Sequence, residues 1–302
     1  AAGGVASAQQ TIVAAGVGAG SATHWPVYIA RQQGFFKEAG VNVDWIGIPS
    51  SAAVMQQLAA GSVNIASSGL VDPLRAADKG APTRLLRSEA AASPYEVVAL
   101  PSVKNWGDLR KKTVMIGGQK DITRIYFEDM ARANGLRPGE YDYLYAGATA
   151  ARFAALAGGS IAATIVTPPF NFKAVSGGFT SLGLSADHTK SFPFTGYSVN
   201  LNWAKSNMKS LKGFLDAYAR GVEWFYEPKN RTEAINILVE QLQADRDDVE
   251  KTYDFFVKIR LFEKEGDLEK AGLKNLINIL KEQGELEGST DLSRFYDPSL
   301  RK

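Results

Sequence analysis

The sequence contains no cysteine among its 302 residues, which excludes disulfide bridges, zinc sites with thiolate ligands and cysteine nucleophiles. Histidine is also scarce, since only His24 and His188 occur, and no carboxylates cluster with the spacing of metal ligands. No serine lies in a G-x-S-x-G motif, and no P-loop occurs. These absences predict a protein with no metal, no cofactor and no enzymatic activity.

The chain also has little net charge and no long apolar segment. Its 34 Lys and Arg residues nearly balance 32 Asp and Glu residues, which gives a formal charge of +2. Such a balance gives no indication of a nucleic-acid or membrane partner. No apolar run is long enough for a transmembrane segment. The length favours two lobes over a single core.

The first ten residues, AAGGVASAQQ, are small or polar. Two interpretations are open. The segment resembles the start of a mature chain after a signal peptide has been removed at a small-residue site, which would place the protein outside the cytoplasm. Alternatively, it is a plain disordered tail.

A glycine-rich loop follows the first predicted strand, Thr11 to Val17. A helix begins near Pro26, because proline suits the first helical turn, and a second strand runs from Val41 to Ile48. This βαβ pattern predicts a parallel sheet. Ligands bind beyond the carboxyl ends of such strands, so we expect the loop from Gly18 to Trp25 to line a binding site.

The same loop does not match the fingerprint of a dinucleotide-binding fold. That fingerprint requires glycine or alanine at its sixth position. Counted from Gly16 the sixth residue is Ser21, and counted from Gly18 it is Thr23. The sequence therefore argues against a dinucleotide cofactor.

An internal repeat predicts two similar α/β lobes. Residues 58–66, LAAGSVNIA, resemble residues 156–164, LAGGSIAAT, and the strands before them keep the same offset. The period is too long for a solenoid. From Lys209 onward apolar residues recur at helical spacing, with a break at Pro228, which predicts four helices that pack on a lobe.

Predicted helix N-termini at strand ends offer unpaired N–H groups and a positive dipole end, which favour an anion. They begin near Pro26, Ser50, Asp72, Asp121 and Thr149. Hydroxyl groups lie at these starts or at strand ends, namely those of Ser50, Ser51, Ser67, Ser68, Thr123 and Thr149. Each hydroxyl can cap its helix, contact a ligand or do both.

Arg124 and His24 each have two open interpretations. Arg124 lies in the first turn of its predicted helix, where a cation is unfavourable to the helix dipole. It therefore either binds an anionic ligand through both arms of its guanidinium or pairs with Asp121 or Glu128. His24 either donates a hydrogen bond to the ligand or is a structural histidine with a partner of its own.

Aromatic residues gather at the predicted strand ends and would suit a ligand with an apolar or ring-like body. They are Trp25, Tyr28, Tyr95, Phe170, Phe194 and Tyr197. Taken singly, most of these aromatic residues are more typical of a protein core than of a ligand contact.

Several segments together resemble the sulfonate/nitrate/taurine-type family of periplasmic solute-binding proteins, which also contains binders of thiamine pyrimidine precursors. The segments are residues 26–30, 34–43, 58–62, 65–67, 106–109 and 112–114. The resemblance covers roughly residues 10 to 240 and both predicted lobes. The cysteine-rich motif of the eukaryotic pyrimidine-synthesising relatives is absent, which argues against that activity.

The resemblance implies an α/β fold of the two-lobe periplasmic-binding-protein kind, type II, with two crossover strands near residues 95–100 and 196–201. Lobe I would comprise residues 1–95 and 197–302, with the C-terminal helices packed on it, and lobe II residues 96–196. Ligand would bind between the lobes, a hinge would close, and an ABC permease would collect the ligand. We expect a monomer in the periplasm or another extracytoplasmic compartment.

The resemblance, together with the helix starts and aromatics, predicts a set of ligand contacts. They are His24, Trp25, Tyr28, Ser50, Ser51, Ser67, Ser68, Asp121, Thr123, Arg124, Thr149, Thr167, Phe170 and Tyr197. We expect the ligand to be a small organic anion, with an aromatic carboxylate or sulfonate favoured. Two alternatives remain, a neutral or cationic heterocycle such as a thiamine precursor, and an enzyme on the same scaffold with His24 as its base.

Overall fold

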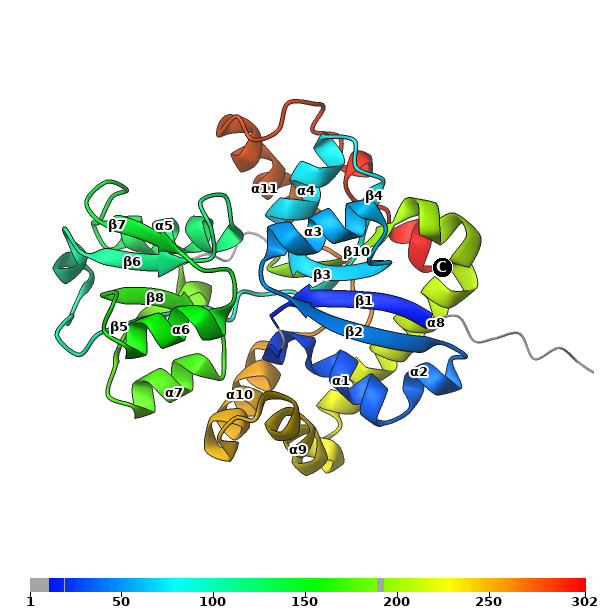
Figure 1. Cartoon of the computed structure of the whole chain (residues 1–302), viewed down its shortest axis with the longest axis horizontal. Helices are drawn as coiled ribbons and strands as arrows, with labels where there is room; N and C mark the ends of the chain where they lie inside the picture. The colour runs from blue at the N-terminus through cyan, green and yellow to red at the C-terminus, as the bar shows by residue number, and fades with distance from the viewer. Residues whose placement is uncertain (1–10, 19, 189–192) are drawn as a thin grey trace, which may run out of the picture.

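The computed structural model describes residues 11–18, 20–188 and 193–302. The N-terminal segment with its two interpretations lies outside these residues. The chain forms two α/β lobes, each built on a five-stranded sheet (Figure 1). Within the described residues, no helix has both the length and the apolar character that crossing a membrane requires.

The sheet of the first lobe has the strand order β2-β1-β3-β10-β4. Its strands are β1 (Thr11–Val17), β2 (Asn42–Ile48), β3 (Ile65–Gly69), β4 (Thr83–Ala90) and β10 (Thr195–Asn200). β1 is parallel to β2 and to β3, as the βαβ pattern predicts. β10 is antiparallel to β3 and β4, because the chain enters it from the other lobe, so the sheet is mixed rather than parallel.

The second sheet repeats this plan with the order β7-β6-β8-β5-β9. Its strands are β5 (Glu96–Ala99), β6 (Thr113–Ile116), β7 (Asp142–Tyr145), β8 (Ala163–Val166) and β9 (Thr180–Leu184). β6, β7 and β8 correspond to β1, β2 and β3, so the repeat in the sequence reflects equivalent structural elements. β5 and β10 are the two predicted crossover strands, with bounds that differ from the prediction by one residue at each end.

Helices cover the sheets and extend the first lobe. Those that connect strands are α1 (Trp25–Gln32), α2 (Phe35–Glu38), α3 (Ser51–Ala60), α4 (Val71–Asp78), α5 (Ile122–Ala133), α6 (Thr149–Ala157) and α7 (Phe170–Ser176). The C-terminal region contributes α8 (Leu201–Tyr226), α9 (Arg231–Leu242), α10 (Arg246–Ile259) and α11 (Lys270–Glu282). Short 3₁₀ helices include Ala22–His24, Trp106–Leu109, Ser185–Asp187, Pro228–Asn230, Leu292–Arg294 and Pro298–Arg301.

The five helices begin at or within one residue of the predicted positions, but the capping side chain is the expected one for α3 and α5 and not for α4 and α6. Ser50 caps α3 and Asp121 caps α5, each by accepting a backbone N–H. The cap of α6 is Ala148 rather than Thr149, and its side chain has no acceptor. The cap of α4 is Leu70 rather than Asp72, which lies inside the first turn.

The C-terminal helices pack on the first lobe, as expected, although α8 begins eight residues earlier than the apolar spacing indicates. Gly221 of α8 allows this helix to approach α1, because a Cβ there would lie 2.4 Å from the carbonyl oxygen of Pro26. The indole N–H of Trp25 donates to the carbonyl oxygen of Ala234 on α9 over 2.8 Å. α10 also reaches α7 of the second lobe, where Phe255 meets Phe172 at 6.2 Å between ring centroids.

Candidate functional site

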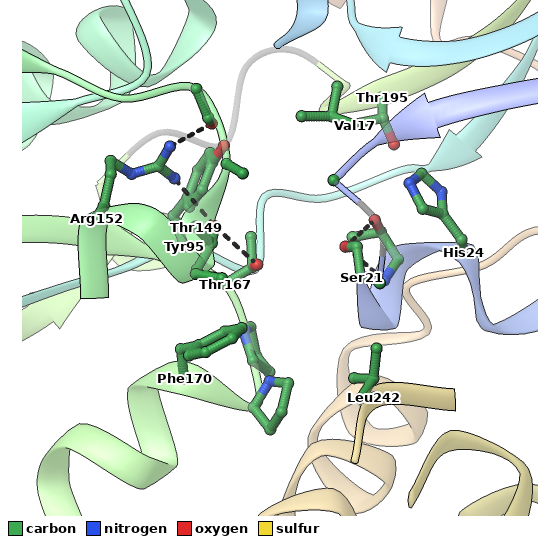
Figure 2. Close-up of a pocket in the computed structure, with 18 of the residues that line it drawn as sticks. Val17, Ser21, His24, Tyr95, Thr149, Arg152, Thr167, Phe170, Thr195 and Leu242 are labelled. Atoms are coloured by element: carbon green, nitrogen blue, oxygen red, sulfur yellow. Dashed lines mark hydrogen bonds between the residues drawn. The ribbon is translucent and has the colours of Figure 1, made fainter. Parts of the chain in front are cut away.

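A cavity of about 400 Å³ lies between the two lobes. Figure 2 shows side chains from both sides converging on it, with Thr149, Arg152, Thr167 and Phe170 on one side and His24, Ser21, Thr195 and Leu242 on the other. The lining combines the carboxyl ends of β1 and β3, the starts of α5 and α6, and the turn between α9 and α10. Its size is that of a pocket for a small molecule.

A buried carboxylate organises the wall that the first lobe contributes. Glu89 is 1% exposed, and its Oε1 accepts from His24 Nδ1 over 2.8 Å and from the Tyr197 hydroxyl over 3.1 Å. Its Oε2 accepts from Thr195 Oγ1 over 2.9 Å and from Ser67 Oγ. Burial, and then the Glu89 carboxylate, raise the pKa of Tyr197 well above its ordinary value. Three of the four donors line the cavity, so Glu89 fixes their orientation from behind.

His24 is held as a structural histidine. Since a carboxylate can only accept, the Nδ1 of His24 carries the proton of its contact with Glu89. Its Nε2 is buried without a partner and faces Gly16, where a Cβ would lie 2.4 Å from that nitrogen. Gly16 thus makes room for the imidazole rather than for a phosphate. The second interpretation given for His24, a histidine with its own partner, describes this contact.

The wall of the second lobe carries positive charge. Gly147, Ala148, Thr149 and Ala150 bring the start of α6 to the cavity. Because Ala148 supplies no side-chain acceptor, the first amides of α6 are left to water or to a ligand. The positive end of the helix dipole adds to this preference for an anion.

Arg152 lies on the same helix turn and is 1% exposed. Its Nε donates to the carbonyl oxygen of Ile165 over 2.9 Å, its Nη1 to that of Ala146 over 2.9 Å, and its Nη2 to Thr149 Oγ1 over 3.0 Å. Within the described part of the chain, no carboxylate forms a salt bridge with this guanidinium. A buried cation without a counter-ion is costly, so an anion in the cavity would stabilise it.

Apolar side chains form a further part of the lining. Phe170 and Leu242 face one another across the lower part of the cavity in Figure 2. Further apolar residues of the lining are Val17, Tyr95, Ile122, Pro168, Pro169 and Phe194. Burial raises the pKa of Tyr95, which the neighbouring Arg152 guanidinium partly offsets, so the phenol stays protonated. The cavity therefore has a cationic wall and an apolar end.

Acidic groups lie at the turn between α9 and α10. Asp245 and Asp248 line the cavity there, opposite Lys173 of α7. Asp245 caps α10 by accepting from the N–H of Asp247 over 2.9 Å. Burial raises the pKa of Asp248, and the positive charges of Lys251 and Lys173 lower it. Asp245 is thus used by the fold as a helix cap, and nearby lysines favour the charged form of Asp248.

The model of the NMT1/THI5-like protein family matches residues 21–231, well over half of the chain. The chain belongs to this family. The match includes most of both lobes and every described residue of the cavity wall from Ser21 to Thr195. No curated protein sequence shows significant similarity to this NMT1/THI5-like chain.

Solved structures share the fold of this NMT1/THI5-like protein at low sequence identity. The alkanesulfonate-binding protein SsuA from Xanthomonas axonopodis pv. citri, bound to MOPS, has a TM-score of 0.74 and 15% identity, over 93% of this chain and 96% of that one. The periplasmic nitrate-binding protein NrtA from Synechocystis has a TM-score of 0.79 and 15% identity, over 97% and 87%. The enzyme DszB, in complex with biphenyl-2-sulfinic acid, has a TM-score of 0.66 and 11% identity, over 96% of this chain and 97% of that one. The expected periplasmic-binding-protein fold is confirmed.

Eight of the fourteen predicted contact residues of the NMT1/THI5-like chain line the cavity. They are His24, Ser51, Ser67, Ser68, Asp121, Thr149, Thr167 and Phe170. Ser50 and Thr123 do not, because their side-chain oxygens accept backbone N–H groups of Ala53 and Gly117. Trp25, Tyr28 and Tyr197 are buried in the core of the first lobe.

Arg124 lies outside this cavity. Its Nε donates to Glu128 over 2.7 Å and its Nη1 to the carbonyl oxygen of Gln119 over 3.0 Å. The arginine lines a separate cavity of about 260 Å³ together with residues of α4, α5 and α11. Of the two interpretations open in the sequence, pairing with Glu128 is the one the structure contains.

Sequence reasoning missed Arg152, Thr195 and Leu242 among the lining residues of this family member. A signal for Arg152 was present, since it follows the start of α6 at Thr149 and a cation is unfavourable there, as for Arg124. Thr195 comes from a crossover strand and Leu242 from the end of a C-terminal helix. Their spacing is that of ordinary packing residues, so no local pattern marks them.

Proposed function

We propose that this protein is the solute-binding component of an ABC importer and captures a small organic anion, an aromatic carboxylate or sulfonate, between its lobes. One observation carries the choice of an anion, namely the buried Arg152 guanidinium beside the uncapped start of α6. The family and the fold support the role of a solute-binding protein. The same proposal includes a permease partner, a periplasmic or other extracytoplasmic location and a monomeric state. It also includes the lobe limits, with residues 1–95 and 197–302 in lobe I and residues 96–196 in lobe II.

The carboxylate or sulfonate would accept hydrogen bonds from the first amides of α6 and from Thr149, with Arg152 supplying the positive charge next to it. The ring would pack on Phe170 and Phe194. Ser68, whose hydroxyl is buried without a partner, would reach the ligand from the first lobe after a change of rotamer. Both lobes would then hold one molecule, which couples binding to closure.

A neutral or cationic heterocycle remains the second candidate, because Asp121, Asp245 and Asp248 also line the cavity. An enzyme is a weaker alternative, supported by DszB having the same fold. In that alternative His24 would be the base, but its Nε2 faces Gly16 and its Nδ1 is occupied by Glu89. A wild-type chain that bound cationic heterocycles and no acids would favour the second candidate.

The ligand class is tested by thermal shift with a matched panel of benzoate, benzenesulfonate, benzamide and benzylamine. We expect the two anions to raise the melting temperature and the amide and amine to leave it unchanged. A ligand present at one hundred times its Kd stabilises by about 2.7 kcal/mol, which a shift of several degrees reports. Native mass spectrometry of the purified protein would identify a co-purified solute. A panel in which only benzylamine stabilises would contradict the proposal.

Closure of the cleft predicts an effect of replacing Gly147 by alanine. A Cβ at Gly147, in the second lobe, would lie 2.4 Å from the carbonyl oxygen of Pro49 and 3.0 Å from the Cα of Ser50, in the first lobe. The backbone there cannot yield, so the variant should favour an open state and bind ligand about tenfold more weakly. Isothermal titration measures the affinity, and small-angle X-ray scattering with ligand measures the opening.

Gly118→Ala is the control for this variant. Gly118 lies in the same lobe and does not line the cavity, and a Cβ there would make only an ordinary contact with Asp121 at 3.4 Å. We expect its affinity and radius of gyration to match those of the wild type. Equal affinities for the two variants would mean that this contact does not limit closure.

A further inference from the structure

We infer that Leu242, the last residue of α9 at the turn into α10, sets the upper size limit for the apolar part of the ligand. The inference rests on the proposed function, which places the charged end of the ligand. It adds the residue that limits the length of the apolar end. Residues 241–245 of this turn all line the cavity. They belong to the C-terminal helical region, outside the family match at residues 21–231.

Leu242 closes the end of the cavity that lies away from the cationic wall. Figure 2 places its side chain across from Phe170, while Arg152 and Thr149 lie at the upper part of the opposite lobe. The side chain is only half-buried in the absence of ligand, so part of its apolar surface is open to the cavity. An anion held at α6 would therefore direct its ring toward Leu242.

Leu242 has little freedom to move away from a ligand. A Cβ at Gly20, on the loop after β1, would lie 2.5 Å from the Leu242 Cδ2 atom. Gly20, in the first lobe, thus leaves room for the Leu242 side chain. A methyl group of Leu242 occupies the space that a side chain at position 20 would take. We therefore expect Leu242 to shift toward the cavity when the space at Gly20 is filled.

The turn itself is held in place by its flanking helices. Trp25 of α1 donates to the Ala234 carbonyl of α9 over 2.8 Å, and its ring meets those of Tyr253 and Phe256 of α10 at 5.8 and 6.2 Å. Gln243 has a φ of +50°, a left-handed conformation that ends α9 sharply. A rigid turn discriminates between ligands by size, because it does not yield to a longer ring.

Two substitutions change the available space in opposite directions. Leu242→Ala removes the apolar end wall and enlarges the cavity. Gly20→Ala adds a methyl group against Leu242 Cδ2, the far end of a flexible side chain that must then shift. We expect this shift to narrow the apolar end of the cavity. Val239→Ala is the matched control, since Val239 is also a half-buried residue of α9 but does not line the cavity.

The test measures Kd for benzoate, 2-naphthoate and biphenyl-4-carboxylate with the wild type and the three variants by isothermal titration. We expect Leu242→Ala to bind the longest acid at least about tenfold more tightly relative to benzoate than the wild type does, and Gly20→Ala to bind it about tenfold less tightly. Val239→Ala should keep the wild-type ratios. Melting temperatures verify that each variant is folded, and ratios within one variant cancel any general loss of stability.

The outcomes separate this inference from the proposed function. If the wild type binds none of the acids, the proposed anion ligand is wrong and the inference is wrong with it. If the wild type binds acids but all variants keep its size ratios, the proposed function survives and Leu242 does not set the limit. Opposite shifts for Leu242→Ala and Gly20→Ala support the inference. If one variant is too unstable for a complete series, a shift of the other in its expected direction supports it.

Discussion

Replacing Arg152 by methionine is expected to weaken the binding of benzoate by about 100-fold or more. The guanidinium is the buried positive charge next to the start of α6, and a charged hydrogen-bonding partner lost from a buried site typically costs about 2–5 kcal/mol of binding free energy. The affinity for a neutral probe, benzamide, should change far less. Isothermal titration of both compounds gives the ratio of the affinity losses for benzoate and benzamide, which isolates the contribution of the charge.

Two further variants separate charge from shape in this experiment. Arg152 also holds the carbonyl groups of Ile165 and Ala146, so the methionine variant loses stability as well. Arg152→Lys keeps the charge but not the planar fork, and should retain more benzoate affinity than Arg152→Met. Arg124→Met should bind like the wild type, because Arg124 pairs with Glu128 outside the cavity. Equal losses for benzoate and benzamide would show that Arg152 acts only through the shape of the wall.

Replacing Glu89 by alanine should lower the free energy of unfolding by about 3–5 kcal/mol, the range found when one partner of a buried charged network is removed. The substitution leaves His24, Ser67, Thr195 and Tyr197 without their common acceptor, a carboxylate that is itself buried. For a chain of this size the melting temperature should fall by about 5–8 °C. Differential scanning calorimetry measures the change.

Glu38→Ala is the control for the calorimetric experiment. Glu38 pairs with Arg220 at the surface, where its side chain is 58% exposed, and such pairs contribute little. Its melting temperature should stay within about 2 °C of the wild type. Glu89→Gln, which keeps the shape but replaces an acceptor oxygen by an NH₂ donor, should lie between Glu89→Ala and the wild type. A Glu89→Ala variant as stable as Glu38→Ala would rule out the structural role assigned to Glu89.

Most of the fold was predictable because its signals are local or repeated. The strand Thr11–Val17 has the predicted bounds, and the repeat at residues 58–66 and 156–164 identified the equivalent parts of the two lobes. The caps at Ser50 and Asp121 depend on a side chain and an amide two or three residues apart. Such short-range interactions are readable without knowledge of the tertiary fold.

The candidate site was only partly predictable, because its composition depends on where helices begin and which way they face. A one-residue change in the cap of α6, from Thr149 to Ala148, leaves amides free that the sequence had assigned to a capped helix. Arg124 and Arg152 both lie just after a helix start, yet Glu128 on the same helix face binds the first, while the second faces the cavity wall. Glu128 stands four residues after Arg124 and Leu156 stands four residues after Arg152, so the sequence offers a partner to the first only. It does not show which of the two arginines reaches the cavity.

The sequence by itself determined the α/β class, the two lobes and a loop with hydroxyl and glycine residues at the cleft, since hydrophobic periodicity and turn residues act over a few positions. The crossover strands were implied by the family resemblance. Only the tertiary structure decided that Glu89 collects four donors from distant segments. It also decided that Arg152 and not Arg124 meets the cavity, and that Leu242 of a C-terminal helix closes it. These contacts join residues far apart in the chain, and their partners are chosen by packing rather than by neighbouring residues.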